Sequence, residues 1–209
     1  MISYVLTAKV CKSNAEQFPD ILKLYVNPGA KILDMTWGNG AFWKDVTETY
    51  EVVANDIDPE RGKFHYDFRQ LPNDWNGIFS VCVCDPPYLG VGGIETLKDS
   101  IDRGYNNKAR AKNSGGGVAA VRRLYAGAII EAWRILCRSG ILILKCMDQV
   151  ESGKQNFLSH DIMDLCNLLG FRVDDEFIFV SSSQPTMRHE HQVHARRNHS
   201  SWVVAKRRP

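Results

Sequence analysis

The most informative segment of this chain is Ile78-Phe79-Ser80-Val81-Cys82-Val83-Cys84-Asp85-Pro86-Pro87-Tyr88. Its apolar part predicts a buried strand, and the two prolines end that strand because proline donates no hydrogen bond to a sheet ladder. The break leaves a carboxylate, two proline carbonyls and an aromatic ring at the carboxyl end of the strand. Ligands bind at that end in open α/β sheets. Acceptors beside a flat ring suit a planar group that carries an amine.

Apolar runs alternate with helical patterns along the chain. We expect strands over Lys31–Met35, Glu51–Asn55, Ile78–Cys84, Gly140–Met147, Glu176–Val180 and Trp202–Ala205, and helices over Ala15–Tyr25, Phe42–Thr49, Val118–Cys137 and Asn156–Leu169. Ser139-Gly140 and Gly170 are the expected stops of the last two helices. This alternation predicts a three-layer α/β fold with a largely parallel sheet. The last two strands have no helix between them, so we expect them to pair antiparallel.

Size and composition favour one domain over residues 1–209, with a net charge of only +2. The six cysteines include no CxxC pair, which favours a reducing, cytoplasmic setting. We interpret Cys82 and Cys84 as core residues on opposite faces of their strand. No signal-peptide pattern opens the sequence, and no apolar run approaches the ~20 residues needed to span a membrane.

A strand enters a glycine turn at Ile32-Leu33-Asp34-Met35-Thr36-Trp37-Gly38-Asn39-Gly40. Gly38 and Gly40 permit close approach of the backbone to a ligand, although a plain strand-to-helix turn is the alternative. Asp56 comes about twenty residues after the turn, where nucleotide-binding α/β folds place an acid that binds ribose hydroxyls. The third glycine of the dinucleotide fingerprint is missing, so a nucleoside without a pyrophosphate fits better than NAD. Asp58 could simply begin a helix and ranks below Asp56.

Asp67 and Phe68 follow another expected short strand. The carboxylate could accept a hydrogen bond from an adenine amino group, and the ring could flank the base. Taken alone, the pair is more typical of ordinary loop and core positions than of an adenine site, because acids and aromatic residues are common there.

Together these segments resemble the S-adenosylmethionine-dependent amino-methyltransferases of nucleic acids, in a small phage- or prophage-like form. The matching order is the turn Asp34–Gly40, Asp56, Asp67 and the Asp-Pro-Pro-Tyr motif Asp85–Tyr88, and His194–Trp202 looks like the last strand of phage and bacterial DNA methylases. The resemblance implies a Rossmann-like methyltransferase fold with a mostly parallel seven-stranded sheet and an antiparallel last strand.

The resemblance also implies the site. The implied residues for binding S-adenosylmethionine are Asp34, Thr36, Gly38, Gly40, Asp56, Ile57, Asp67, Phe68 and Asp85. The implied catalytic residues are Asp85, Pro86, Pro87 and Tyr88. In this chemistry Tyr88 stacks on an extruded base, Asp85 and the Pro86 carbonyl accept hydrogen bonds from its exocyclic amine, and the methyl passes directly to nitrogen. The family often has an aromatic residue where Thr36 stands, so packing around the cofactor should differ there.

Basic residues gather in two regions that we expect to contact DNA phosphates. They are Lys98, Arg103, Lys108, Arg110, Lys112 and Arg122 in and after the glycine-rich stretch 90–117, and Arg196 and Arg197 near the C-terminus. We expect 90–117 to be a mobile lid or target-recognition insert. Solvated surface is the alternative for both regions. No metal site is expected, because His189, His191, His194 and His199 lack matching cysteines or acids.

The predicted function is methyl transfer to an exocyclic amine of a nucleic-acid base, with N6 of adenine in DNA favoured over N4 of cytosine. Three alternatives stay open. The chain could methylate RNA at guanine N2 or adenine N6, because similar motifs occur in enzymes that act on RNA, although the lack of an evident extra RNA-binding domain favours DNA. It could methylate a protein glutamine amide, although that family usually has Asn where Asp85 stands. It could also be an inactive cofactor-binding subunit, against which the intact motif argues.

Overall fold

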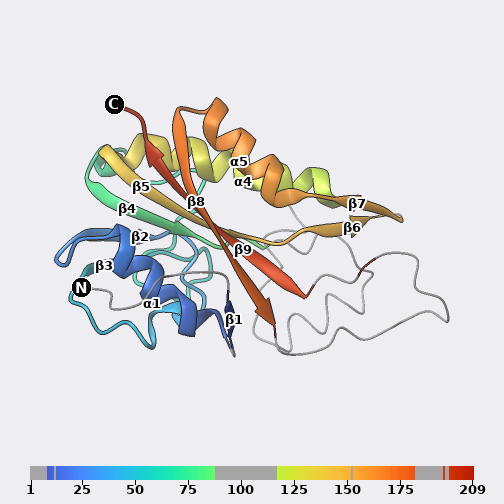
Figure 1. Cartoon of the computed structure of the whole chain (residues 1–209). Coiled ribbons are helices and arrows are strands. Elements are labelled where there is room, and N and C mark those ends of the chain that lie inside the picture. The colour runs from blue at the N-terminus through green and yellow to red at the C-terminus, as the bar shows by residue number, and fades with distance from the viewer. Residues whose placement is uncertain (1–8, 12, 88–116, 152, 182–194, 196–197) are drawn as a thin grey trace.

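The computed structural model describes residues 9–11, 13–87, 117–151, 153–181, 195 and 198–209. They form a seven-stranded sheet in the order β1-β8-β9-β5-β4-β2-β3 (Figure 1). Neighbouring strands are parallel except that β9 runs antiparallel to both β5 and β8. The strands are β1 (Lys9–Cys11), β2 (Lys31–Asp34), β3 (Glu51–Ala54), β4 (Phe79–Cys84), β5 (Leu136–Cys146), β8 (Phe171–Ser181) and β9 (His199–Arg207).

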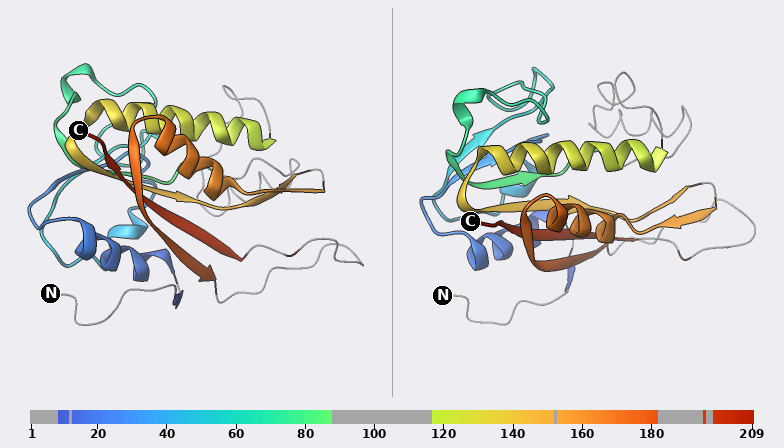
Figure 2. Two further views of the ribbon diagram at one scale, coloured as in Figure 1. Left: turned by 45° about the horizontal axis from the view of Figure 1, so that its top comes forward. Right: turned by 90° about the horizontal axis from the view of Figure 1, so that it is seen from above.

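Helices cover both faces of this sheet. Helix α1 (Asn14–Tyr25) lies on one face, and α4 (Gly117–Ile135) and α5 (Leu158–Leu168) lie on the other, below and above the sheet in Figure 1 and in the left view of Figure 2. A separate hairpin of β6 (Gln149–Glu151) and β7 (Lys154–Asn156) follows β5 and extends past the sheet. Two short 3-10 helices, η1 (Ala41–Trp43) and η2 (Asn73–Trp75), lie in the connections. In the described part of the chain no helix combines the length and apolar character needed to cross a membrane.

Alternate residues of the central strands enter two separate apolar clusters. Leu33, Cys82 and Leu144 belong to the cluster under α4 and α5, whereas Val83 and Ile143 belong to the cluster under α1. Cys82 and Cys84 are both in the first cluster, so the expectation of opposite faces was wrong: residues two apart in a strand share a face. The core placement of these cysteines is confirmed by their complete burial.

The three-layer fold, the mostly parallel sheet and the antiparallel pairing of the last two strands are confirmed. The helix expected over Phe42–Thr49 was wrong, since only one turn of 3-10 helix, η1, forms there. Branched Val46, Thr47 and Thr49 disfavour a helix. The aromatic side chains of η1 pack on α1 instead, with the Trp43 ring 5.1 Å from that of Phe18.

Three further features of the fold differ from the prediction. Helix α4 ends at Ile135 and the chain passes directly into β5, so Ser139-Gly140 is an irregularity within that strand rather than a helix stop. The strand expected before Asp67 is reduced to one parallel bridge between Asn55 and Phe64. The seventh strand is β1 at the far edge of the sheet, which the sequence did not predict.

Candidate functional site

The order β3-β2-β4-β5 brings the carboxyl ends of four parallel strands to one edge, where the predicted site residues gather. Asp34 ends β2 and is 1% exposed. Its Oδ1 accepts a hydrogen bond from the Thr36 amide at 3.0 Å, and its Oδ2 accepts one from Nε1 of Trp43 at 2.7 Å. Burial raises the pKa of Asp34 to about 7; the charges of Asp85 and Asp56 add to this rise, and the two hydrogen bonds oppose it.

The glycine turn needs both of its glycines for different reasons. Gly38 and Gly40 have φ angles of 57° and 62°, which ordinary residues avoid. The Gly38 amide donates to Oδ2 of Asp56 at 2.7 Å, which fixes the expected ribose acid against the turn. Gly40 lies against the indole of Trp37, so that a Cβ atom there would come within 2.7 Å of the ring. Ile57, beside Asp56, is 47% exposed.

Buried Asn55 connects this turn to the next segment. Its Nδ2 donates to the carbonyls of Met35 and Tyr66 at 3.1 and 3.0 Å, and its Oδ1 accepts from the Tyr66 amide at 2.9 Å. These bonds hold the backbone that leads to Asp67 beside the glycine turn. The sequence prediction missed Asn55, although an amide at the end of an apolar run was a visible signal.

Asp67 and Phe68 are placed differently from the expectation for an adenine site. Both oxygens of Asp67 are engaged by Arg69, with Nε 2.9 Å from Oδ1 and Nη2 2.5 Å from Oδ2. These bonds hold the pKa of Asp67 below its usual range. Phe68 is half-buried against the core under α4. An adenine amine would therefore have to compete with Arg69 for this carboxylate.

Asp85 follows β4 directly and is joined to the glycine turn by its backbone. Its amide donates a hydrogen bond to Oγ1 of Thr36 at 2.7 Å, so the Thr36 hydroxyl links the glycine turn to the segment after β4. The Asp85 side chain is 15% exposed. Its Oδ1 is buried and has no hydrogen-bond partner among the described residues. Pro86 is buried and Pro87 half-buried, whereas Tyr88 lies outside the described residues.

The structure adds one charged side chain that the sequence prediction missed. Lys145 of β5 is 3% exposed, and its Nζ lies 3.5 Å from Oδ2 of Asp85. The same ammonium lies over the rings of Phe42 and Trp202, 5.5 and 5.9 Å from their centroids. A lysine within the apolar run Ile141–Cys146 was the available signal.

Of the residues expected to bind nucleic acid, only Arg122 lies within the described part of the chain. It is on α4 and pairs with Asp161 of α5, with Nη2 2.6 Å from Oδ2. Lys98, Arg103, Lys108, Arg110, Lys112, Arg196 and Arg197 lie outside the described residues, as do 90–116 of the expected lid and His189, His191 and His194. Among the residues that are described, no group of histidine, cysteine and acidic side chains could hold a metal ion.

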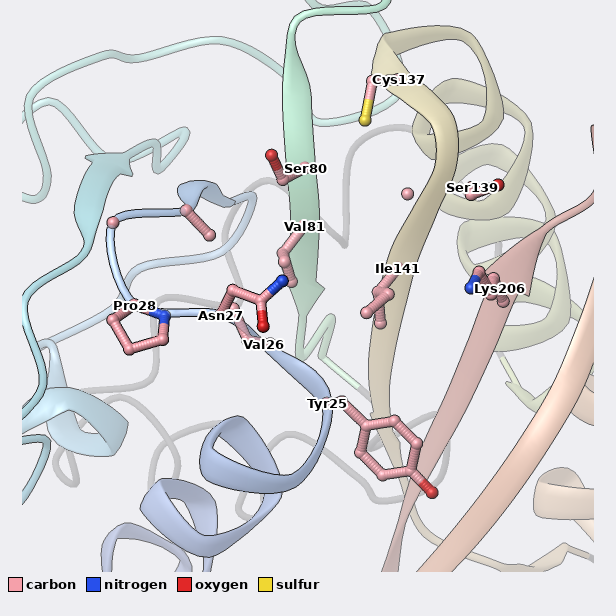
Figure 3. Close-up of a pocket in the computed structure, with 13 residues that line it drawn as sticks. Tyr25, Val26, Asn27, Pro28, Ser80, Val81, Cys137, Ser139, Ile141 and Lys206 are labelled. Carbon is pink, nitrogen blue, oxygen red and sulfur yellow. The ribbon is translucent and has the colours of Figure 1, made fainter. Parts of the chain in front are cut away.

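A cavity of about 410 Å³ opens at the opposite edge, near the amino ends of β4 and β5 (Figure 3). Its lining includes Tyr25, Asn27, Ser80, Ser139 and Lys206. The Tyr25 hydroxyl donates to Asp175 of β8. None of the residues expected to bind the cofactor lines this cavity, so it is separate from the site around Asp85.

No protein-family model matches the sequence, and no curated protein matches it. Solved structures do. An S-adenosylmethionine-dependent methyltransferase from Methanosarcina mazei is 12% identical over 90% of this chain and 97% of its own, with a TM-score of 0.56. The Burkholderia thailandensis 1,6-didemethyltoxoflavin-N1-methyltransferase, solved with S-adenosylhomocysteine, is 12% identical over 95% and 80%, with a TM-score of 0.53. The [4+2]-cyclase SpnF is 13% identical over 98% and 88%, with a TM-score of 0.57.

Identities this low carry information on the fold alone, and SpnF shows that the fold hosts more than one chemistry. The chain has the Rossmann-like fold of S-adenosylmethionine-dependent methyltransferases.

Proposed function

We propose that this protein transfers a methyl group from S-adenosylmethionine to an exocyclic amine of a nucleic-acid base, with N6 of adenine in DNA as the favoured target. The observation that carries the proposal is the buried Oδ1 of Asp85 at the carboxyl end of β4, which has no hydrogen-bond partner within the described part of the chain. A buried acceptor without a partner is unfavourable by about 1–3 kcal/mol. An amine donor from a bound substrate would remove that cost.

The charges at the sheet edge support S-adenosylmethionine as the cofactor. Asp34, Asp56 and Asp85 are close enough that the charges of the last two raise the pKa of the first. A ligand that carries both a sulfonium and an ammonium group offsets such a concentration of carboxyl groups. Asp56 would bind the ribose hydroxyls, and Gly38 and Gly40 let the ligand approach the backbone. The fold likeness to methyltransferases agrees with this choice.

The residues around Asp85 would act by positioning and electrostatics. Asp85 Oδ1 and the Pro86 carbonyl would accept hydrogen bonds from the target amine, and Tyr88 would stack on the base. The nitrogen lone pair would form the bond to the methyl carbon, the sulfur–carbon bond would break with its electron pair going to sulfur, and the methylated nitrogen would then release its extra proton to water. Orientation of this kind supplies about 7–11 kcal/mol in favourable cases.

The test is expression in a host without DNA methylases, followed by mass spectrometry and sequencing of modified bases in its DNA and RNA. The wild-type protein should produce N6-methyladenine in DNA, and Asp85→Ala should not. Asp164→Ala, which removes an exposed carboxyl of α5, is the matched control and should leave the modification intact. Calorimetry should find that Asp85→Ala still binds S-adenosylhomocysteine.

The same experiment separates the alternatives. Modified bases only in RNA would move the activity to RNA, and N4-methylcytosine would change the target base. Cofactor binding without methylation of either nucleic acid would refute the proposal and favour an inactive subunit. Tyr88→Ala should weaken substrate stacking by about 1–3 kcal/mol, and Tyr88→Phe should be milder because the ring remains.

A further inference from the structure

Lys145 and Asp85 form a buried ion pair that is set by strand register. Parallel pairing aligns Val83 with Ile143 and Cys84 with Leu144, so the next residues along the two strands, Asp85 and Lys145, lie side by side. Val83 and Ile143 face the α1 layer, and the same alternation directs Asp85 and Lys145 to that face. Lys145 also pairs with Trp202 of β9, which places the indole beside the ammonium.

The surroundings of Lys145 limit where its charge can act. Its side chain is 4% exposed, and the rings of Phe42 and Trp202 border the ammonium at 5.5 and 5.9 Å. Aromatic faces attract a cation but do not neutralise it. Asp85 Oδ2, at 3.5 Å, is the carboxylate oxygen that the ammonium contacts. Lysine is almost never fully buried unless it is paired, so the burial of Lys145 depends on its ion pair with Asp85.

The two oxygens of Asp85 thus have different environments. Oδ2 faces the ammonium, whereas Oδ1 is buried without a hydrogen-bond partner among the described residues. The amide of Asp85 is held by Thr36, which limits how far the residue can turn. Of the two oxygens, only Oδ2 is contacted by a charged side chain among the described residues.

We propose that Lys145 is a positioning residue that holds Oδ2 of Asp85 and thereby presents Oδ1 as the acceptor for the target amine. The inference rests on the proposed function, because it assigns a substrate to Oδ1. Lys145 touches neither the base nor the methyl group. Its charge favours the ionised form of Asp85 inside a buried site, so that the carboxylate can accept a hydrogen bond from the amine and stabilise the positive charge that develops on nitrogen.

The electrostatics around Asp85 agree in direction. Burial raises the pKa of Asp85, and Lys145 opposes that rise. Among the described residues, the other ionisable groups whose pKa responds to the charge of Asp85 are Asp34 and the thiols of Cys84 and Cys146. If Lys145 were lost, none of these groups could replace its positive charge, because each is neutral or negative. The pKa of Asp85 would then rise further.

The experiment is a carbon-13 NMR titration of aspartate side-chain carboxyls, with Asp85 assigned by Asp85→Asn. Lys145→Met keeps an unbranched side chain, one heavy atom shorter, and removes its charge. We expect the titration midpoint of Asp85 to rise by about one pH unit or more in this variant. Lys206→Met is the matched control, since Lys206 lies on β9 beside Ile141, in the middle of β5 and away from the residue pair Lys145–Trp202, and should leave the midpoint unchanged. An unchanged midpoint in Lys145→Met would overturn the inference.

A second measurement covers the case in which Lys145→Met does not fold. In Asp85→Asn, the midpoint of the Lys145 ammonium should fall relative to the wild type, because the carboxylate that stabilises its charge is gone. An unchanged titration midpoint of the Lys145 ammonium would show that the two side chains do not form an ion pair, and would overturn the inference.

Activity separates failure of this inference from failure of the proposed function. In an active wild type, Lys145→Met should reduce methyl transfer by about tenfold or more near neutral pH, move the acid limb of the pH profile upward, and leave S-adenosylhomocysteine affinity unchanged. Equal activity and an unmoved acid limb would refute the role of Lys145 alone. A wild type that methylates no nucleic acid, although the NMR shift is present, would instead refute the proposed function and with it the assignment of Oδ1 to an amine.

Discussion

Asp34 should make this protein less stable as the pH rises, which is the opposite of the usual effect of a carboxyl group. Its pKa rises from 3.8 in the unfolded chain to about 7 in the folded one, so the folded state binds the proton more tightly. The stabilisation from this proton is therefore complete below the unfolded pKa of 3.8 and is lost as the pH rises toward about 7. At about 1.4 kcal/mol per pKa unit, this loss should lower the free energy of unfolding by about 2–3 kcal/mol between pH 5 and pH 8.

Urea denaturation of the wild type and of Asp34→Asn at both pH values isolates this contribution. The substitution removes one of the acceptors for Thr36 and Trp43, which costs about 1–3 kcal/mol at either pH. The variant also has no carboxyl to titrate at position 34, so its free energy of unfolding should not fall between pH 5 and pH 8 as that of the wild type does. At pH 8 the variant should therefore be only slightly less stable than the wild type. A difference between the two proteins that stays the same at both pH values would refute the reasoning.

Two other substitutions probe the glycine turn and its link to Asp85. Thr36→Val deletes the hydroxyl that accepts from the Asp85 amide and should lower the free energy of unfolding by about 1–3 kcal/mol in chemical denaturation. Gly40→Ala adds a Cβ at positive φ within 2.7 Å of the Trp37 indole, so it should destabilise the protein by more than the ~1 kcal/mol expected from backbone conformation alone. Gly29→Ala is its control, because Gly29 also has positive φ but has open space around it. Equal losses at Gly40 and Gly29 would show that the indole contact carries no energy.

The central strands could be predicted from the sequence because their residues are apolar on both faces. Phe79–Cys84 and the buried part of β5 appear as continuous apolar runs, as expected of strands covered by helices on both sides. The segment 42–49 failed because tertiary contacts of Phe42 and Trp43 with α1 outweigh a weak helical pattern. Strand β1 has three residues, too few for any periodicity to be visible.

The candidate site was predictable where its residues are close in sequence. The turn Asp34–Gly40 and the motif after β4 each form a local pattern, and the structure places both at one edge of the sheet. Lys145 was not predictable in the same way, because its partner is sixty residues away and their contact depends on the register of β4 and β5. The sequence prediction also missed the hydrogen bonds between Asp67 and Arg69, although these residues are two apart in the chain. The sequence does not reveal whether such an acid pairs with the nearby arginine or binds a ligand.

The gathering of Asp34, Asp56 and Asp85 has a consequence for turnover. If S-adenosylmethionine binds there, it arrives with a sulfonium charge and leaves, after methyl transfer, as a neutral thioether. The carboxyl groups that favour the incoming cofactor lose that attraction at the moment the methyl departs. We therefore expect the spent cofactor to dissociate more readily than the fresh one, so that the site limits its own product inhibition.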